Sequence, residues 1–118
     1  MLTWFADGAG RGWATCPLTE SGFVRVSSNR AAVPSPVGTE TARGVLRALC
    51  THPAHSFVVD DVSLTDGDVP AIAGHRQVTD AHLLTLARRR GARVLTFDAG
   101  MLALAGGSDA DVELLRAL

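Results

Sequence analysis

The sequence has 118 residues, 47% of them hydrophobic, which suits one small domain with its own core. A net charge of −1 excludes a strongly basic protein, and since the eleven basic residues are all arginines, any contact with nucleic acid has to come from local arginine clusters. No stretch approaches the roughly 18 apolar residues of a membrane span, and the N-terminus lacks the pattern of a signal peptide. We therefore expect one domain over residues 1–118, in the cytoplasm and without a membrane partner.

The N-terminal half predicts one strand and two helices. A strand at 13–16 follows a glycine-rich turn at 7–12. A dinucleotide-binding fingerprint needs its glycines after a strand, so nucleotide binding is disfavoured here. Pro17 suits the first turn of a helix, which we expect from Leu18 to Ser28. Thr39 can cap a second helix, whose apolar stripe consists of Ala42, Val45, Leu46 and Leu49.

The C-terminal half predicts two further strands around one helix. An apolar strand at 56–59 ends on two aspartates, and a loop with short helical turns at 62–65 and 70–73 follows. The helix from Thr79 to Arg90 is closed by Gly91. The elements after it are a strand at 93–97, one helical turn at 101–104 and a tail at 111–115, which fits an edge strand or a helix and which we expect to be a strand.

The alternation of strands and helices predicts an α/β fold, a three-layer sandwich with a mainly parallel sheet between helices. Ligands of such folds bind outside the carboxyl ends of the strands. The acids that the sequence brings to this edge are Glu20, Asp60, Asp61, Asp80 and Asp98.

Three of these acids are candidate metal ligands. Glu20 and Asp80 each lead the apolar stripe of a predicted helix, and Asp98 follows a predicted strand. Carboxylates are hard oxygen ligands that suit Mg²⁺ or Mn²⁺, and three of them would repel one another unless a cation lay between them. Such a cation activates water and stabilises charge on a phosphoryl group, so the pattern favours a metal-dependent phosphodiesterase.

Each acid also has a structural interpretation. Asp80 or Glu20 in a first helical turn gains about 0.3–1 kcal/mol from the helix dipole alone. Asp98 fits an ordinary turn, and Asp60 and Asp61 fit a solvated loop or a helix cap better than a metal site.

The roles of several other polar and aromatic residues are also considered from the sequence. The arginines at 88–90, together with Arg25, fit an RNA path or a solvated helix end equally well. His75 and Arg76 fit a phosphate contact or plain surface. The two cysteines, Cys16 and Cys50, lack zinc or redox spacing, so we expect buried thiols, and we expect Trp4 and Trp13 to be packing anchors.

Three segments resemble the PIN-domain toxins of the VapC family, namely residues 12–26, 74–84 and 95–98. They contain Leu-Thr-Glu ending at Glu20, Val-Thr-Asp ending at Asp80 and Thr-Phe-Asp ending at Asp98. The resemblance implies an endoribonuclease dependent on Mg²⁺ or Mn²⁺, dimeric and inhibited by a VapB-like antitoxin. It assigns these three acids as catalytic residues and metal ligands, with water attacking RNA in line to leave 5′-phosphate and 3′-hydroxyl ends.

The sequence departs from the family at its N-terminus. The family begins with a central strand that carries a fourth acid in a Leu-Leu-Asp-x-Asn motif, and Asp7, in a glycine turn, cannot replace it. We therefore expect a PIN-like domain that is incomplete at its N-terminus, with two neighbouring strands lacking a partner and little or no ribonuclease activity at physiological magnesium. The alternatives are a non-catalytic remnant that binds the antitoxin or another partner, and a magnesium-dependent hydrolase of small phosphoesters.

Overall fold

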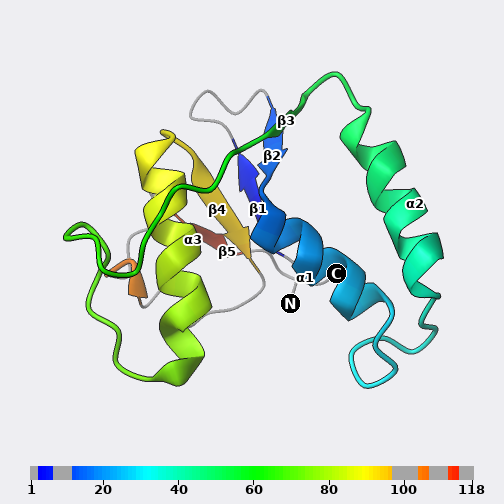
Figure 1. The fold of residues 1–118 in the computed structure, drawn as a ribbon, viewed down its shortest axis with the longest axis horizontal. Helices are drawn as coiled ribbons and strands as arrows, with labels where there is room; N and C mark the ends of the chain where they lie inside the picture. Colours follow the sequence, from blue (N-terminus) through cyan, green and yellow to red (C-terminus); the bar gives the residue numbers. More distant parts are fainter. Residues whose placement is uncertain (1–2, 7–11, 97–103, 107–111, 115–118) are drawn as a thin grey trace.

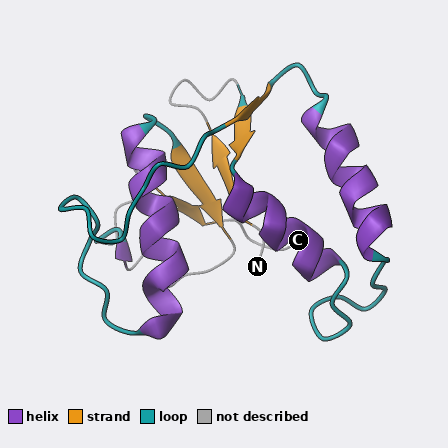
Figure 2. Ribbon diagram, in the orientation of Figure 1, coloured by secondary structure: helices purple, strands orange, loops and turns teal. Residues whose placement is uncertain are grey.

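The computed structural model describes residues 3–6, 12–96, 104–106 and 112–114. These residues form a five-stranded sheet with helices against it (Figures 1 and 2). The strands are β1 (Thr3–Ala6), β2 (Trp13–Thr15), β3 (His55–Phe57), β4 (Arg93–Thr96) and β5 (Val112–Leu114). The helices are α1 (Pro17–Ser27), α2 (Thr39–Cys50), the 3-10 helix η1 (His75–Gln77) and α3 (Val78–Arg89). None of the helices described is long and apolar enough to cross a membrane.

The strands lie in the order β3-β2-β1-β4-β5. The outer pairs, β2 with β3 and β4 with β5, are parallel. The central strand β1 is antiparallel to both β2 and β4, so the other four strands all run in one direction. The expected α/β class with a mainly parallel sheet is confirmed.

The strand β1 differs from the expectation for the N-terminus. The missing central strand that the resemblance implies would leave a gap in the sheet beside two strands. Instead Phe5 pairs with Ala14 of β2 on one side and with Val94 of β4 on the other. Aromatic and β-branched residues favour strands, and a central position pairs the backbone groups of β1 on both sides. The expected gap is therefore filled by the chain's own residues.

Helix α3 supplies most of the core. Its apolar stripe is buried against Val94 of β4 and Val112 of β5, as predicted, and Gly91 ends it in the left-handed conformation with φ 65°. The start of α1 joins the same cluster through the fully buried Cys16. Helices α1 and α3 thus cover the same face of the sheet, and α2 lies beside α1 (Figure 1). The buried side chains of the α3 stripe are Leu83, Leu84, Leu86 and Ala87.

The apolar stripe of α2 is only partly buried. Ala42 is 1% exposed, but Val45 is 47% and Leu49 37% exposed. Helix α2 packs mainly on α1 and touches the sheet at β3, which leaves the far part of its stripe beside an open groove.

The other boundaries follow the predictions closely. The strand expected at 56–59 is β3, which begins one residue earlier and ends two residues earlier, and the tail is the strand β5, as expected. Between residues 62 and 74 the chain makes turns but no helix, and the helical turn comes later, at η1. The glycine turn at 7–11 and most of the segment expected to be a helical turn at 101–104 lie outside the described residues.

A core substitution tests this arrangement. Leu84 is fully buried, so we expect Leu84→Ala to lower the free energy of unfolding by about 2–5 kcal/mol through lost burial and a residual cavity. The matched control is Leu64→Ala at a position 45% exposed, where the change should stay within about 0.5 kcal/mol. Urea unfolding of both variants measures the difference, and equal losses would contradict the packing described.

Candidate functional site

Glu20 and Asp80 lie at the edge of the sheet where β2 and β4 end. β2 and β4 run in the same direction, and β2 leads directly into α1, whose first turn carries Glu20. Helix α3 begins at this edge and runs back along β4, so Asp80 in its first turn lies at the same end of the sheet (Figure 1). Asp98 follows β4 by two residues and lies outside the described part of the chain.

The start of α1 fixes the backbone of Glu20. Cys16 occupies the cap position in extended conformation, and Pro17 takes the first helical position, where no backbone N–H is needed. The Thr19 hydroxyl accepts a hydrogen bond from the Cys16 N–H at 2.9 Å and donates to the Cys16 carbonyl at 3.1 Å. The helix therefore begins at one defined residue, and Glu20 is held half-buried.

The carboxylate of Glu20 is held by a polar network. The hydroxyl of Thr15, a residue 2% exposed, donates to Glu20 Oε2 at 2.6 Å. Since that hydroxyl has a single proton, its contact of 2.8 Å with His55 Nε2 requires the imidazole to donate. The thiol of Cys50 lies 3.8 Å from the same carboxylate oxygen. The network orients Glu20 through Oε2.

Three of these side chains form a group that the sequence did not predict. Glu20, Cys50 and His55 place one ligand atom each within 4.8 Å of one another, the one such group of histidine, cysteine and acidic residues in the described ranges. Asp80 is half-buried in α3 and is not a member. The sequence signal was weak, because Cys50 and His55 belong to a helix end and a strand with no familiar ligand spacing.

The prediction of two buried thiols holds for Cys16 but not for Cys50, which is partly exposed at the end of α2. Burial raises the pKa of the Cys50 thiol, and the negative charge of Glu20 raises it further. The thiol form is therefore favoured next to the carboxylate.

Asp60 links the loop after β3 to α3. Its Oδ1 accepts from the Val62 N–H at 3.1 Å, which is a turn contact of the predicted kind, and its Oδ2 lies 2.6 Å from His82 Nε2. Asp61 is exposed and 3.4 Å from Arg90. Both acids thus hold the loop in place.

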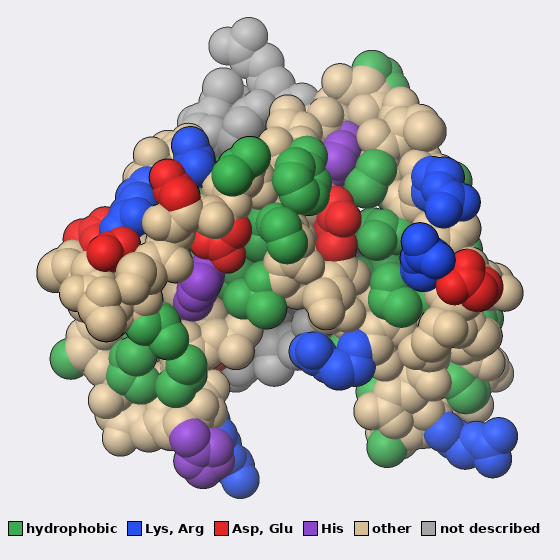
Figure 3. Space-filling view, viewed as in Figure 1, with side chains coloured by type: hydrophobic (Ala, Val, Ile, Leu, Met, Phe, Trp, Pro, Cys, Tyr) green, Lys and Arg blue, Asp and Glu red, His purple; other side chains and the backbone are tan. Residues whose placement is uncertain are grey.

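The arginines at the end of α3 make contacts with the same loop. Arg89 bonds Asp66 at 2.8 Å and Asp68 at 2.6 Å, and Arg90 donates to the Val59 carbonyl at 2.8 Å. Figure 3 shows the arginines spread over this face in separate places. An RNA path along these arginines stays a prediction, whereas their contacts with the loop are observed in the structure.

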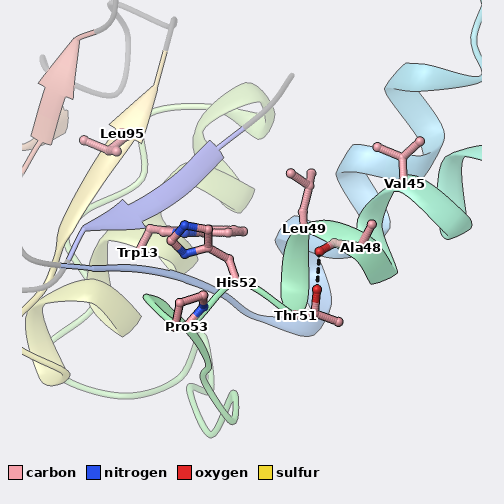
Figure 4. Close-up of a pocket in the computed structure, with 8 residues that line it drawn as sticks. All are labelled: Trp13, Val45, Ala48, Leu49, Thr51, His52, Pro53 and Leu95. Atoms are coloured by element: carbon pink, nitrogen blue, oxygen red, sulfur yellow. Dashed lines mark hydrogen bonds between the residues drawn. The ribbon is translucent and has the colours of Figure 1, made fainter.

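An apolar groove of about 900 Å³ lies on the other side of the sheet from α3. Trp13 of β2 and Leu95 of β4 line it from the sheet, and α2 with the following turn lines it from the side (Figure 4). The Trp13 ring also lies 4.6 Å from the His55 ring, which fits its predicted role in packing. No acidic side chain is among the described lining residues, so the groove does not suit phosphodiester hydrolysis. The lining residues from α2 and the turn are Val45, Ala48, Leu49, Thr51, His52 and Pro53.

Comparisons with known proteins place the chain among named ribonucleases. Ribonuclease VapC38 of Mycobacterium tuberculosis (strain ATCC 25618 / H37Rv) is 64% identical over 102 residues, which cover 86% of this chain and 72% of VapC38. Ribonuclease VapC39 of the same strain is 44% identical, covering 83% of this chain and 73% of that protein. Ribonuclease VapC29 is 38% identical, covering 80% and 68%. No protein-family model matches the chain.

The ion pairs of Arg89 predict a dependence of stability on pH. The Arg89 guanidinium holds the pKa of both Asp66 and Asp68 below the usual range. A lowered pKa means that the stabilisation is complete above the unfolded value of about 3.9 and is lost as the pH falls through the folded value. We expect Arg89→Gln to unfold at lower urea than the parent chain near pH 7, with the difference vanishing near pH 2.

The matched control is Arg47→Gln at an exposed position of α2, which should leave the pH dependence unchanged. An Arg89→Gln deficit of the same size at both pH values would contradict the ion-pair explanation.

Proposed function

Because the chain belongs to the VapC family of ribonucleases, we propose that it hydrolyses phosphodiester bonds of RNA as the toxin of a toxin–antitoxin pair. The observation that carries this proposal is that β2 and β4 end at the same edge of the sheet. Glu20 and Asp80 each lie in the first turn of a helix that begins at this edge. Asp98, two residues after the end of β4, is proposed to complete the site.

The site is proposed to hold Mg²⁺ or Mn²⁺ through Glu20, Asp80 and Asp98. The donor set fits, since carboxylate oxygens are the ligands that these hard cations prefer. The two hydrogen bonds that the Glu20 carboxylate accepts from described residues, from Thr15 and Cys50, both end on Oε2, which leaves Oε1 for a cation. When bound, the ion lowers the pKa of a water molecule and neutralises charge on the phosphoryl group.

The chain's own residues then have distinct tasks. Thr15 donates to Glu20 Oε2, which fixes the orientation of the carboxylate. Asp80, at the third position of α3, is favoured as an anion by the N-terminal end of the helix dipole. With Asp98 these carboxylates position the attacking water and the scissile phosphate in line, so that hydrolysis leaves 5′-phosphate and 3′-hydroxyl ends.

The partners follow from the family. We propose one PIN-like domain over residues 1–118 that acts in the cytoplasm on RNA, forms a homodimer and is inhibited by a VapB-like antitoxin. The near-neutral charge and the scattered arginines of Figure 3 favour contacts with RNA that are local.

A second candidate is a binding protein without catalysis that retains the antitoxin surface. The central strand β1 favours it, because its sequence Thr-Trp-Phe-Ala contains no acid. The resemblance implies a fourth carboxylate on a central strand, and β1, the central strand that the structure describes, does not supply it. Three carboxylates attract a divalent cation less strongly than four do.

Metal-dependent cleavage of labelled RNA tests the proposal. We expect little or no cleavage at physiological magnesium, an increase at higher Mg²⁺ or with Mn²⁺, and none in EDTA. Asp80→Asn should lower the rate at least about a hundredfold, because loss of residues that merely support a metal ligand already costs 10- to 100-fold. The control Asp61→Asn removes an exposed acid that pairs with Arg90 and should cleave like the parent chain.

Cleavage that persists in EDTA, or that Asp80→Asn leaves unchanged, would contradict the metal site. RNA left intact at every metal concentration, with the antitoxin still bound, would establish the binding protein instead.

A further inference from the structure

The side chains around Glu20 differ from a magnesium site in their chemistry. Cys50 offers sulfur, His55 offers imidazole nitrogen and Glu20 offers oxygen, all within 4.8 Å of one another. Magnesium prefers oxygen ligands and keeps several waters, whereas thiolate and imidazole suit zinc and related ions. From this donor set we propose that Glu20, Cys50 and His55 form a binding site for a zinc-like transition-metal ion.

The distances are close to those of a bound site. Zinc lies about 2.3 Å from sulfur and about 2.0–2.2 Å from nitrogen or oxygen, so tetrahedral ligand atoms lie about 3.5 Å apart. Cys50 Sγ is 3.8 Å from Glu20 Oε2, which is already near this separation. All three ligand atoms lie within 4.8 Å of one another, so small shifts of these partly buried side chains bring them to this separation.

Neighbouring residues preorganise the group. Thr15 bonds both Glu20 and His55 and is itself buried, so it fixes two of the three ligands relative to each other. Trp13 packs against the His55 ring and restricts its rotation. Supporting contacts of this kind are typical of metal ligands.

Metal binding removes one proton from the site. The metal–sulfur bond forms as the Cys50 thiol releases its proton to solvent, and a ring nitrogen of neutral His55 provides its lone pair. The three side chains supply three ligands, and water fills the fourth position of a tetrahedral ion. No oxidant or reductant is needed.

The inference goes beyond ribonuclease activity, although it shares Glu20 with the site proposed for it. A zinc-like ion at this group engages the carboxylate that the hydrolytic site also needs. The two metals therefore compete for Glu20. The thiolate and imidazole donors give the zinc-like ion the higher affinity for this group.

Cobalt spectroscopy of the full chain tests the site without any RNA. Co²⁺ added to reduced, metal-free protein should give a thiolate-to-cobalt charge-transfer band and the strong visible bands of a tetrahedral ion, saturating at one equivalent. Zn²⁺ should remove the bands, and a large excess of Mg²⁺ should not. Cys50→Ser should abolish the charge-transfer band, and His55→Gln should weaken cobalt binding at least about tenfold.

The matched control is His75→Gln, an exposed histidine of η1, which should bind cobalt like the parent chain. Circular dichroism verifies that the variants fold, and the His55→Gln result stands even where Cys50→Ser fails to fold. The absence of a thiolate band, or a band unchanged in folded Cys50→Ser, would overturn the inference. RNA cleavage is measured in a separate assay that contains magnesium and no zinc or cobalt. A failure to bind cobalt and a failure to cleave RNA are therefore distinguishable.

Discussion

The antiparallel placement of β1 between β2 and β4 is the constraint on which the rest of the structure depends. One strand that pairs antiparallel on both sides makes its two neighbours parallel to each other. The carboxyl ends of β2 and β4 consequently share one edge, and the helices that begin there bring Glu20 and Asp80 to it. The same strand joins the half built from β2, β3, α1 and α2 to the half built from α3, β4 and β5.

Local sequence patterns predicted the elements that have a strong apolar periodicity or a clear start signal. The α3 stripe was predictable because Leu83, Leu84 and Ala87 recur at helical spacing, and Pro17 marked the start of α1. The strand β1 was missed, because four residues contain too little periodicity to separate a strand from the end of a helix. Its conformation is decided by pairing with two strands that are distant in sequence.

Tertiary placement explains the other misses. An amphipathic pattern predicts that a helix has a packing partner but not how far along the helix that partner reaches, and Val45 and Leu49 of the predicted stripe lie beside the groove. The contact of Glu20 with Cys50 and His55 depends on how α1, α2 and β3 meet, which no ligand spacing in the sequence encodes. The candidate acids stay predictions: Glu20 and Asp80 lie in the first turn of a helix, as the sequence predicts, and Asp98 lies outside the described residues.

Two kinds of metal chemistry meet at one carboxylate in this account. The hard oxygen ligands Asp80 and Asp98 are proposed to share Glu20 with the soft donors Cys50 and His55, and Thr15 fixes the orientation of Glu20 Oε2. Paramagnetic NMR with Mn²⁺ tests most directly whether the sheet edge assembles the hydrolytic site, because signal broadening falls steeply with distance from the ion. We predict that substoichiometric Mn²⁺ broadens the amide signals around residues 20, 80 and 98 together, and that Mg²⁺ reverses the effect. Broadening confined to residues 50–55, or none that is specific, would contradict it.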